Sequence, residues 1–275
     1  KNVEILMGSG SLANDAVAAQ LSLEKGKGLI LSNGEFGERL IDHADRAGLK
    51  FESIKIPWGD IFDYQEVSNT LSSNAEIKWV WMVHSETSTG VLNDLKTLKD
   101  ICKKRGTHIC LDCVSSLGTL GIDLSRVYLA SGVSGKGLAS YSGLSFVFYN
   151  HEIASSNSIP RYFDIGFYAE SDGIPFTMSS NLIYALREAF KAFHNDQKYQ
   201  NIVEITKWVR AKIRHAGFEI VAEEQNSSPG LLTISLPSWL SSSDLGKKLQ
   251  DKGFHLHWRS QYLIEKNWIQ IALMG

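Results

Sequence analysis

Cysteine is scarce in this 275-residue chain, which contains only Cys102, Cys110 and Cys113. Three cysteines do not make a disulfide framework, so we expect a protein of the reducing cytoplasm. The chain also lacks an excess of charge of either sign, because 28 basic and 30 acidic residues leave a net charge of −2. Such a balance provides no basic surface for nucleic acid, and no nucleic-acid partner is predicted. The longest apolar runs have the length of strands, so no association with a membrane is predicted either.

A metal site is not expected. Cys110 and Cys113 form a C-x-x-C pair, but no second cysteine or histidine pair follows at the spacing of a zinc site. His255 and His257 would share one face of a strand, and two surface histidines are the simpler interpretation.

Apolar runs alternate with amphipathic stretches along most of the chain. The runs predict strands at 3–7, 28–32, 51–56, 79–84, 108–111 and 144–149. The stretches predict helices at 12–23, 37–47, 65–71, 95–104, 182–194 and 203–215. Asp60 and Asp94 are placed to cap helices, and Gly48, Gly106 and Gly217 to end them. The alternation predicts an α/β fold, with a mostly parallel sheet sandwiched by helices.

Small or polar residues follow several of these strands directly. They are Gly10, Ser32 and Asn33, residues 84–87, and Asp112. Ligands of a parallel sheet bind at the carboxyl ends of its strands, so we expect these residues to converge on one binding site.

The pattern changes after about residue 195. A long amphipathic helix leads to a hinge at residues 228–230, which are Ser-Pro-Gly. A strand at 231–236, a helix near 243–252 and strands at 254–258 and 268–273 are predicted beyond it. The chain is long enough for two lobes. We therefore predict a large domain at residues 1–194 and a smaller α+β domain at residues 195–275.

Two short segments indicate the chemistry. Asp112 follows an apolar strand, and Lys136 stands between two glycines in residues 131–138. An acid that keeps a pyridinium nitrogen protonated and a lysine that can form an imine are what pyridoxal phosphate (PLP) chemistry requires of a protein. Either residue alone has a structural interpretation, as a loop anchor or as a solvated lysine.

A Gly-Ser-Gly-Ser turn at residues 8–11 precedes an alanine-rich helix. The free amides at a helix N-terminus bind anions, and the two glycines would let a phosphate approach the amides of Gly10, Ser11 and Leu12. The spacing matches neither a Walker A loop nor a dinucleotide fingerprint, which disfavours a nucleotide.

Together these segments resemble the class V aminotransferases of PLP fold type I, a group that includes the alanine-glyoxylate, serine-glyoxylate and 2-aminoethylphosphonate aminotransferases. The similar motifs, in family order, are residues 33–39, 84–91, 112–118, 136–138, 143–147, 184–189 and 271–275. The resemblance implies fold type I with PLP as the cofactor. Compared with the family, the chain starts late and stops early, so we expect a missing N-terminal segment and a truncated small domain.

The resemblance also implies roles for individual residues. Lys136 would form the Schiff base and move the proton, and Asp112 would bind the ring nitrogen. Further cofactor contacts are implied for Phe36 and Val114 on the ring faces, Thr87 at the phenolic oxygen, and Gly10, Ser11 and Leu12 at the phosphate. Thr177 would reach the phosphate of a neighbouring subunit, which implies a homodimer with shared active sites. For Phe36 and Val114, a position in the core is the alternative interpretation.

The sequence departs from the family at two places. Many relatives have a glutamine before the lysine that contacts the phosphate, whereas this chain has Gly135, so Ser134 or the backbone would substitute. The family's arginine for the substrate carboxylate is replaced by Gln270, which offers no charged, bidentate fork. Arg259 could supply the charge instead, although a surface arginine is an equal interpretation.

The expected function is that of an aminotransferase, which moves an amino group from an amino acid or amine to a small 2-oxo acid. A lyase or decarboxylase reaction stays open, because the residue at position 270 is where reaction specificity would change. A cysteine desulfurase is disfavoured, since no cysteine follows Cys113. A catalytically silent PLP-fold protein is the remaining alternative, and the presence of both Lys136 and Asp112 argues against it.

Overall fold

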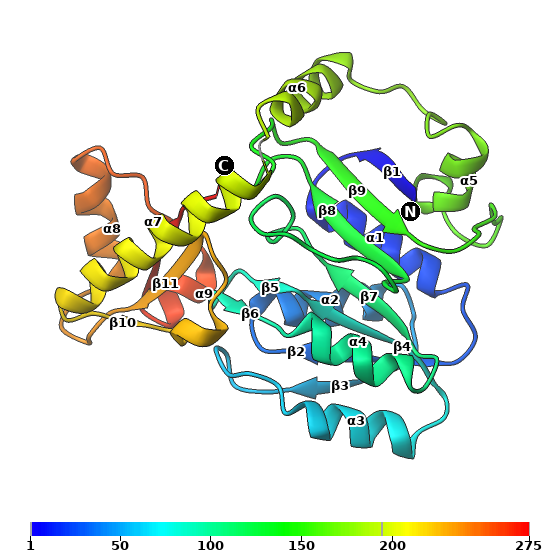
Figure 1. Cartoon of the computed structure of the whole chain (residues 1–275), viewed down its shortest axis with the longest axis horizontal. Coiled ribbons are helices and arrows are strands. Elements are labelled where there is room, and N and C mark those ends of the chain that lie inside the picture. The colour runs from blue at the N-terminus through cyan, green and yellow to red at the C-terminus, as the bar shows by residue number, and fades with distance from the viewer. Residues whose placement is uncertain (1, 194, 275) are drawn as a thin grey trace.

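The computed structural model describes residues 2–193 and 195–274. We call residues 2–193 the large domain and residues 195–274 the small domain; each is built on its own sheet (Figure 1). The predicted boundary falls on His194, which lies outside the described residues, as do Lys1 and Gly275.

The large domain contains a seven-stranded sheet with the order β1-β9-β8-β7-β4-β2-β3. Strand β9 runs antiparallel to both of its neighbours, and all other neighbouring pairs are parallel. The strands are β1 (Asn2–Met7), β2 (Lys27–Ser32), β3 (Phe51–Lys55), β4 (Ile77–Val83), β7 (His108–Asp112), β8 (Leu129–Val133) and β9 (Leu144–Tyr149). The mostly parallel sheet predicted from the alternating pattern is confirmed.

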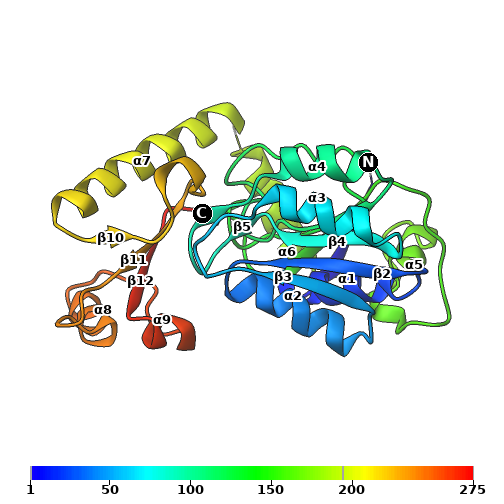
Figure 2. The ribbon, with the colours of Figure 1, turned by 90° about the horizontal axis from the view of Figure 1, so that it is seen from below.

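Helices cover both faces of this sheet (Figure 2). They are α1 (Gly10–Leu21), α2 (Glu35–Arg46), α3 (Tyr64–Ser73), α4 (Leu95–Lys103), α5 (Ile165–Glu170) and α6 (Ser180–Lys191). Helices α1, α2 and α5 bury apolar side chains in one core, whereas α3 and α4 pack into a second core on the opposite face.

Strand β4 shows why a parallel sheet forms here. Its side chains alternate between the two cores, with Trp79, Trp81 and Val83 on the side of α1 and Val80 and Met82 on the side of α3. All five are at most 3% exposed. A strand that is apolar on both faces must be covered on both faces, as in α/β proteins.

Strand β8 was missed in the sequence, because its residues Ser131, Gly132 and Val133 were assigned to the turn that carries Lys136. In the structure this segment pairs with both β7 and β9. A Cβ at Gly132 would lie 2.7 Å from a methyl carbon of Leu117, so the glycine permits close packing on this strand rather than a turn.

The cap predictions were partly correct. Asp94 caps α4 by accepting a hydrogen bond from the Thr97 amide, 3.0 Å away. The prediction for Asp60 was wrong, since α3 is capped by Asp63, which accepts from the Gln65 amide at 2.8 Å. The three glycines predicted to end helices all have positive φ, at +68° for Gly48, +66° for Gly106 and +83° for Gly217.

The small domain has an antiparallel sheet with the order β10-β11-β12. Its elements are α7 (Asn195–His215), β10 (Glu219–Ile220), β11 (Leu231–Ser235), α8 (Ser242–Asp251), α9 (Gln261–Glu265) and β12 (Trp268–Ala272). The strand predicted at 254–258 was wrong, because this segment pairs with β12 only at His257, opposite Gln270.

The two domains meet at the hairpin of β5 (Ser85–Glu86) and β6 (Val91–Leu92). The Ser85 hydroxyl donates to the Ser228 hydroxyl at 2.7 Å, and the Thr233 hydroxyl donates to the Ser88 carbonyl at 3.0 Å. Within the described parts of the chain, each helix is too short or too polar to cross a lipid bilayer.

Candidate active site

A pocket of about 590 Å³ opens where β1, β7 and β8 end. All of its lining residues belong to the large domain. They are residues 8–11, Asn14, Phe36, Arg39, His43, Asp112, Val114, Val133, Gly135, Lys136, Ser142 and Gly143. The fold thus brings Gly10, Ser11, Phe36, Asp112, Val114 and Lys136 together, although these residues are far apart in the sequence.

The Gly-Ser-Gly-Ser turn forms one wall of the pocket. Helix α1 starts at Gly10, and the preceding Ser9 makes no side-chain cap, so its hydroxyl does not occupy the first amides of the helix. A Cβ at Gly10 would lie 2.8 Å from each methyl carbon of Val114. Glycine therefore lets the helix N-terminus lie directly against this apolar side chain, where an anion would meet the amides and the helix dipole.

Asp112 is a buried carboxylate that is bonded to neutral donors. Its Oδ2 atom accepts from the Asn14 amide at 2.8 Å, and its Oδ1 atom accepts from the Val114 backbone amide at 2.8 Å. The side chain is only 5% exposed, and no ion pair to it is present among the described residues. A carboxylate in this setting can be stabilised further by a cationic atom of a ligand.

Lys136 lies in the loop after β8, and its Nζ atom donates to the Ser115 hydroxyl at 2.9 Å. The Ser115 hydroxyl also forms a short contact with the Thr87 hydroxyl. Burial lowers the pKa of Lys136, and the negative charges of Asp112 and Glu86 oppose this shift. A lysine with a lowered pKa has more of its amine in the neutral, nucleophilic form.

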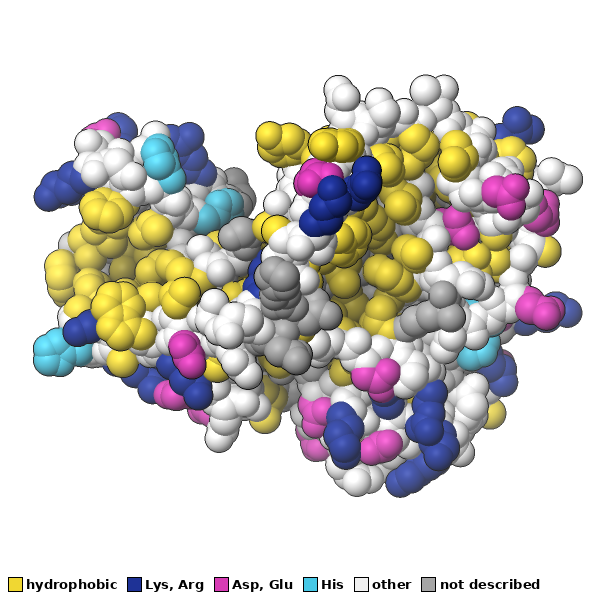
Figure 3. Space-filling view, turned by 45° about the horizontal axis from the view of Figure 1, so that its top comes forward, with side chains coloured by type: hydrophobic (Ala, Val, Ile, Leu, Met, Phe, Trp, Pro, Cys, Tyr) yellow, Lys and Arg dark blue, Asp and Glu magenta, His cyan; other side chains and the backbone are white. Residues whose placement is uncertain are grey.

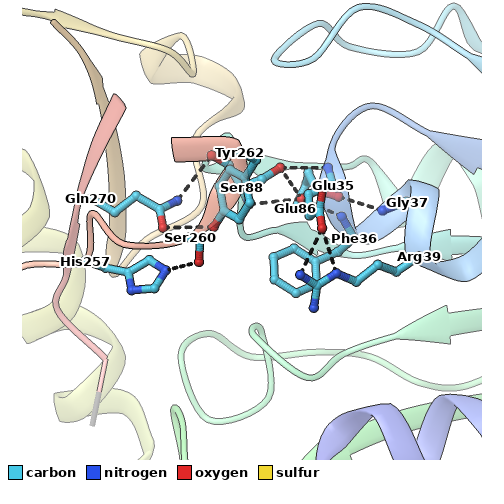
Figure 4. Close-up of polar contacts among 10 residues, drawn as sticks. All are labelled: Glu35, Phe36, Gly37, Arg39, Glu86, Ser88, His257, Ser260, Tyr262 and Gln270. Carbon is cyan, nitrogen blue, oxygen red and sulfur yellow. Dashed lines mark hydrogen bonds and ion pairs between the residues drawn. The ribbon is translucent and has the colours of Figure 1, made fainter. Parts of the chain in front are cut away.

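The Phe36 ring lies at the first turn of α2, beside the lysine. The Lys136 Nζ atom is 5.6 Å from the ring centroid, and the Arg39 guanidinium carbon lies 4.8 Å from the same centroid. Arg39 in turn donates to the Glu35 carboxylate at 2.9 Å, so its charge is already paired (Figure 4).

Glu86 fixes the start of α2 and thereby the position of Phe36. Its fully buried carboxylate accepts from the backbone amides of Phe36 at 3.3 Å and Gly37 at 3.0 Å, and from the Ser88 hydroxyl at 2.6 Å (Figure 4). Burial raises the pKa of Glu86, and these hydrogen bonds oppose the shift. A Cβ at Gly34 would lie 2.5 Å from Glu86, so glycine is needed at that turn.

Several predicted site residues do not line the pocket. The Leu12 amide donates to the Ser9 carbonyl at 3.0 Å. The buried Ser134 hydroxyl donates to the Tyr141 carbonyl at 2.7 Å, which leaves the Gly135 backbone, on the pocket wall, as the predicted substitute at the phosphate. Thr177 is exposed, and Thr87 reaches Lys136 only through Ser115.

The Gln270 side chain is hydrogen-bonded to other residues in the interior of the protein. Its Nε2 atom donates to the Thr87 carbonyl at 2.6 Å and to the Thr233 hydroxyl at 2.9 Å, and its Oε1 atom accepts from the Tyr262 hydroxyl at 3.2 Å. The residue is only 2% exposed. Its amide therefore joins the small domain to the large one, and both of its polar atoms are occupied.

The Arg259 side chain contacts residues of its own domain, the small one. Its guanidinium donates to Gln250 at 2.7 Å and lies 5.0 Å from the centre of the Trp258 ring. The structure does not bring this residue into the pocket lining. Its side chain would have to leave both partners to reach a ligand there.

Three residues that contribute to the site were not singled out in the sequence: Asn14, Ser115 and Glu86. Asn14 carried only a weak signal, as a polar residue within an alanine-rich helix, because its burial is not visible in the sequence. Ser115 and Glu86 lay inside motifs that had been recognised, but their partners are distant in sequence. Within the described residues, no group of three or more histidine, cysteine or acidic side chains is arranged to hold a metal ion.

Comparison with known proteins gives consistent matches. The sequence model of the family "Aminotransferase class-V" matches residues 2–160. A "Soluble hydrogenase 42 kDa subunit" from Anabaena cylindrica is 30% identical over 83% of this chain, which spans 63% of that relative's length. A 2-aminoethylphosphonate–pyruvate transaminase from Pseudomonas entomophila is 28% identical over 92% of this chain and 73% of its own length. The crystal structure of an alanine–glyoxylate aminotransferase from Nostoc sp. superimposes with a TM-score of 0.86 at 27% identity, covering 99% of this chain and 76% of that one.

Proposed function

Because this chain belongs to the class-V aminotransferase family, whose members depend on PLP, we propose that it transfers an amino group from an amino acid or amine to a small 2-oxo acid. One observation carries the proposal. The buried Asp112 carboxylate and the partly buried Lys136 amine share one pocket, beside a helix N-terminus that is open to an anion.

The residues of the pocket fit PLP. Asp112 is a buried carboxylate bonded to neutral donors, and Asn14 beside it has a buried Oδ1 atom without a partner among the described residues. The close approach of Gly10 to Val114 leaves no side chain between the turn and the apolar wall. Asp112 would hold the ring nitrogen, the amides of residues 10 and 11 the phosphate, and Phe36 and Val114 the faces of the ring.

When bound, PLP supplies an aldehyde that reacts with amines and a ring that accepts an electron pair from the substrate carbon. The protein has to attach and orient the cofactor and to exchange protons with the substrate. The Lys136 amine is placed to attach the cofactor and to carry a proton to or from the substrate carbon, and the lowering of its pKa by burial favours the form that accepts a proton. Ser115, held by Thr87, orients its Nζ atom.

The relatives support the substrate class. The names of the Pseudomonas and Nostoc proteins each pair an amino donor with a small 2-oxo acid, pyruvate or glyoxylate. We propose the same class of acceptor here, with the donor left open between an amino acid and an amine.

The proposal is tested by adding PLP to the purified protein and following the absorbance of the cofactor. Amino donors are then supplied singly, and 2-oxo acids afterwards. We expect at least one donor to convert the bound cofactor to its amino form and pyruvate or glyoxylate to restore it. Release of carbon dioxide or elimination of a substrate group, without this reversible change, would instead indicate a decarboxylase or lyase. Failure to bind PLP, or binding of PLP without reaction with any donor, would indicate a silent relative.

A homodimer with shared active sites is part of the proposal. Large exposed apolar side chains lie on and near α6, with Ile174 at 68%, Tyr184 at 60% and Phe190 at 52% exposure. Figure 3, which brings the α6 end of the molecule forward, shows many yellow side chains on the surface of the large domain. Thr177 lies in the same region and is exposed, as a residue that reaches a partner's phosphate would have to be. Apolar surface of this kind is typical of interfaces.

Light scattering after gel filtration is expected to give the mass of a dimer. Ile174→Asp should shift the mass toward that of a monomer and lower the affinity for PLP, because a buried charge opposes association. Trp239→Ser, which removes an exposed aromatic residue of the small domain, serves as the control and should change neither. A native protein that is monomeric and fully active would contradict the shared site.

We also propose a cytoplasmic location and a domain boundary near residue 194. Cys102, Cys110 and Cys113 are all buried as thiols, which suits a reducing compartment. The separate sheets on either side of residue 194 support the boundary.

A further inference from the structure

The pocket has no positive group ready for the carboxylate of a substrate on the large-domain side. Arg39 is paired with Glu35, and His43 is paired with Asp15. Lys136 is required for the cofactor. All lining residues belong to the large domain. A group that binds the free end of the substrate would therefore come from the small domain.

Gln270, at the position of the family's arginine, is not that group, because its amide is already hydrogen-bonded to Thr87, Thr233 and Tyr262. Its hydrogen bond to the Thr87 carbonyl shows, however, that this face of β12 is turned toward the large domain. A neighbour on the same face would point the same way.

His257 is that neighbour. Its backbone is paired with Gln270 by two hydrogen bonds, of 2.8 and 3.2 Å, in an antiparallel bridge. Residues directly opposite in such a pair have side chains on the same face, with Cβ atoms about 4.5–5.5 Å apart. In Figure 4 the His257 imidazole projects beside Ser260 on the small-domain side, with Phe36 and Arg39 on the other side of the view.

The His257 imidazole has one ring nitrogen available to bind an anion. One ring nitrogen, Nε2, is held by the Ser260 hydroxyl at 2.9 Å, and no hydrogen bond to Nδ1 is present among the described residues. The residue is open to solvent, although its ring is partly desolvated. A histidine oriented through one nitrogen presents the other to a ligand, and in its protonated form that nitrogen is a charged donor.

The Lys136 ammonium lies close enough for its field to act on His257. Burial lowers the pKa of His257 first, and the charge of Lys136 lowers it further. Lys136, from the loop after β8, is the charged group whose field reaches the imidazole. Arg259, two residues further along the chain, is bonded to Gln250. The face that His257 shares with Gln270 is linked to the lysine by direct contacts. Gln270 donates to the Thr87 carbonyl, the Thr87 hydroxyl contacts the Ser115 hydroxyl, and that hydroxyl accepts from Lys136.

We propose that His257 binds the carboxylate of the amino-acid donor and of the 2-oxo acid, in place of the arginine that this chain lacks. The inference rests on the proposed aminotransferase function and names the part of its substrate that the small domain recognises. Because only the protonated imidazole carries charge, binding should strengthen as the pH falls through the pKa of His257, which desolvation and the Lys136 charge lower from its ordinary value.

Binding of propionate to the PLP-loaded enzyme tests the proposal without relying on turnover, because propionate has a carboxylate but neither an amino nor an oxo group. Calorimetry at pH 6 and pH 8 gives its affinity. We expect tighter binding at pH 6. His257→Gln keeps a polar side chain without the charge, and it should weaken binding at pH 6 about tenfold or more, the effect of losing one charge-assisted hydrogen bond. His257→Arg should restore binding and make it nearly independent of pH.

His215→Gln is the matched control, because it removes another exposed imidazole of the small domain, at the end of α7, and should leave propionate binding unchanged. In turnover, His257→Gln should raise KM for amino acids and 2-oxo acids, leave kcat nearly unchanged, and leave KM for simple amines unchanged. A residue with only a structural role would not produce this difference between substrates.

Unchanged propionate binding in His257→Gln at both pH values would overturn the proposal, and so would weakened binding in Arg259→Ala alone. The aminotransferase function and the carboxylate site at His257 can be refuted separately. Propionate binding that depends on His257, in a protein without transamination, would refute the proposed function but not the carboxylate site. Transamination with unaltered KM values in His257→Gln would refute the site but not the function.

Discussion

Lys136→Ala is expected to lose the covalent attachment of PLP and to lower turnover by about 10²- to 10⁴-fold, the range for removal of a group that transfers protons in the rate-limiting step. The structure explains why no other lysine should substitute. The Lys136 amine is oriented by Ser115 within the pocket, and burial lowers its pKa. Borohydride reduction of the PLP-loaded protein, followed by peptide mapping, should place the pyridoxyl label on Lys136.

Lys198 makes this a stringent test, because its amine lies beside the loop that carries Lys136. It donates to the Gly137 carbonyl at 2.5 Å, and burial lowers its pKa as well. A label on Lys198 would contradict the assignment. Lys103→Ala, which removes an exposed lysine at the end of α4, should keep both label and activity.

Asp112→Asn is expected to keep much of the affinity for PLP but to lower kcat about 10- to 100-fold, because a charged hydrogen bond of about 1.5–3 kcal/mol is replaced by a neutral one. The local structure should survive. The new amide can still accept from the Val114 backbone, and it can donate to the Asn14 Oδ1 atom, which has no partner among the described residues. Titration with PLP measures affinity, and steady-state rates with the best donor measure kcat.

Asp123→Asn provides the control for this substitution, since it neutralises an exposed carboxylate that is paired with Lys99 outside the pocket. Its kcat should equal that of the native protein. Near-normal turnover in Asp112→Asn would mean that the ring nitrogen does not depend on this carboxylate, and the role given to Asp112 would be wrong.

The sequence by itself determined the type of sheet, and it assigned Gly10 and Asp112 to the same edge of that sheet. Alternation of apolar and amphipathic segments requires helices on both faces, as β4 shows with Trp81 in one core and Val80 in the other. In a mostly parallel sheet, segments that follow strands must meet at one edge. Gly10 and Asp112 could therefore be assigned to one site before their contact through Asn14 and Val114 was visible.

Only the tertiary structure decided how the site is completed. Ser115 orients Lys136, Glu86 holds the start of α2, and Gln270 bonds to the Thr87 carbonyl; each contact joins residues far apart in the chain. Local pattern cannot show such contacts, because a polar side chain looks the same in sequence whether it faces solvent or a distant partner. The sequence thus identified Gln270 as a departure from the family but could not show which residues its amide contacts. Two tertiary contacts were needed to separate the two candidates: His257 pairs with Gln270, whereas Arg259 is bonded to Gln250 within the small domain.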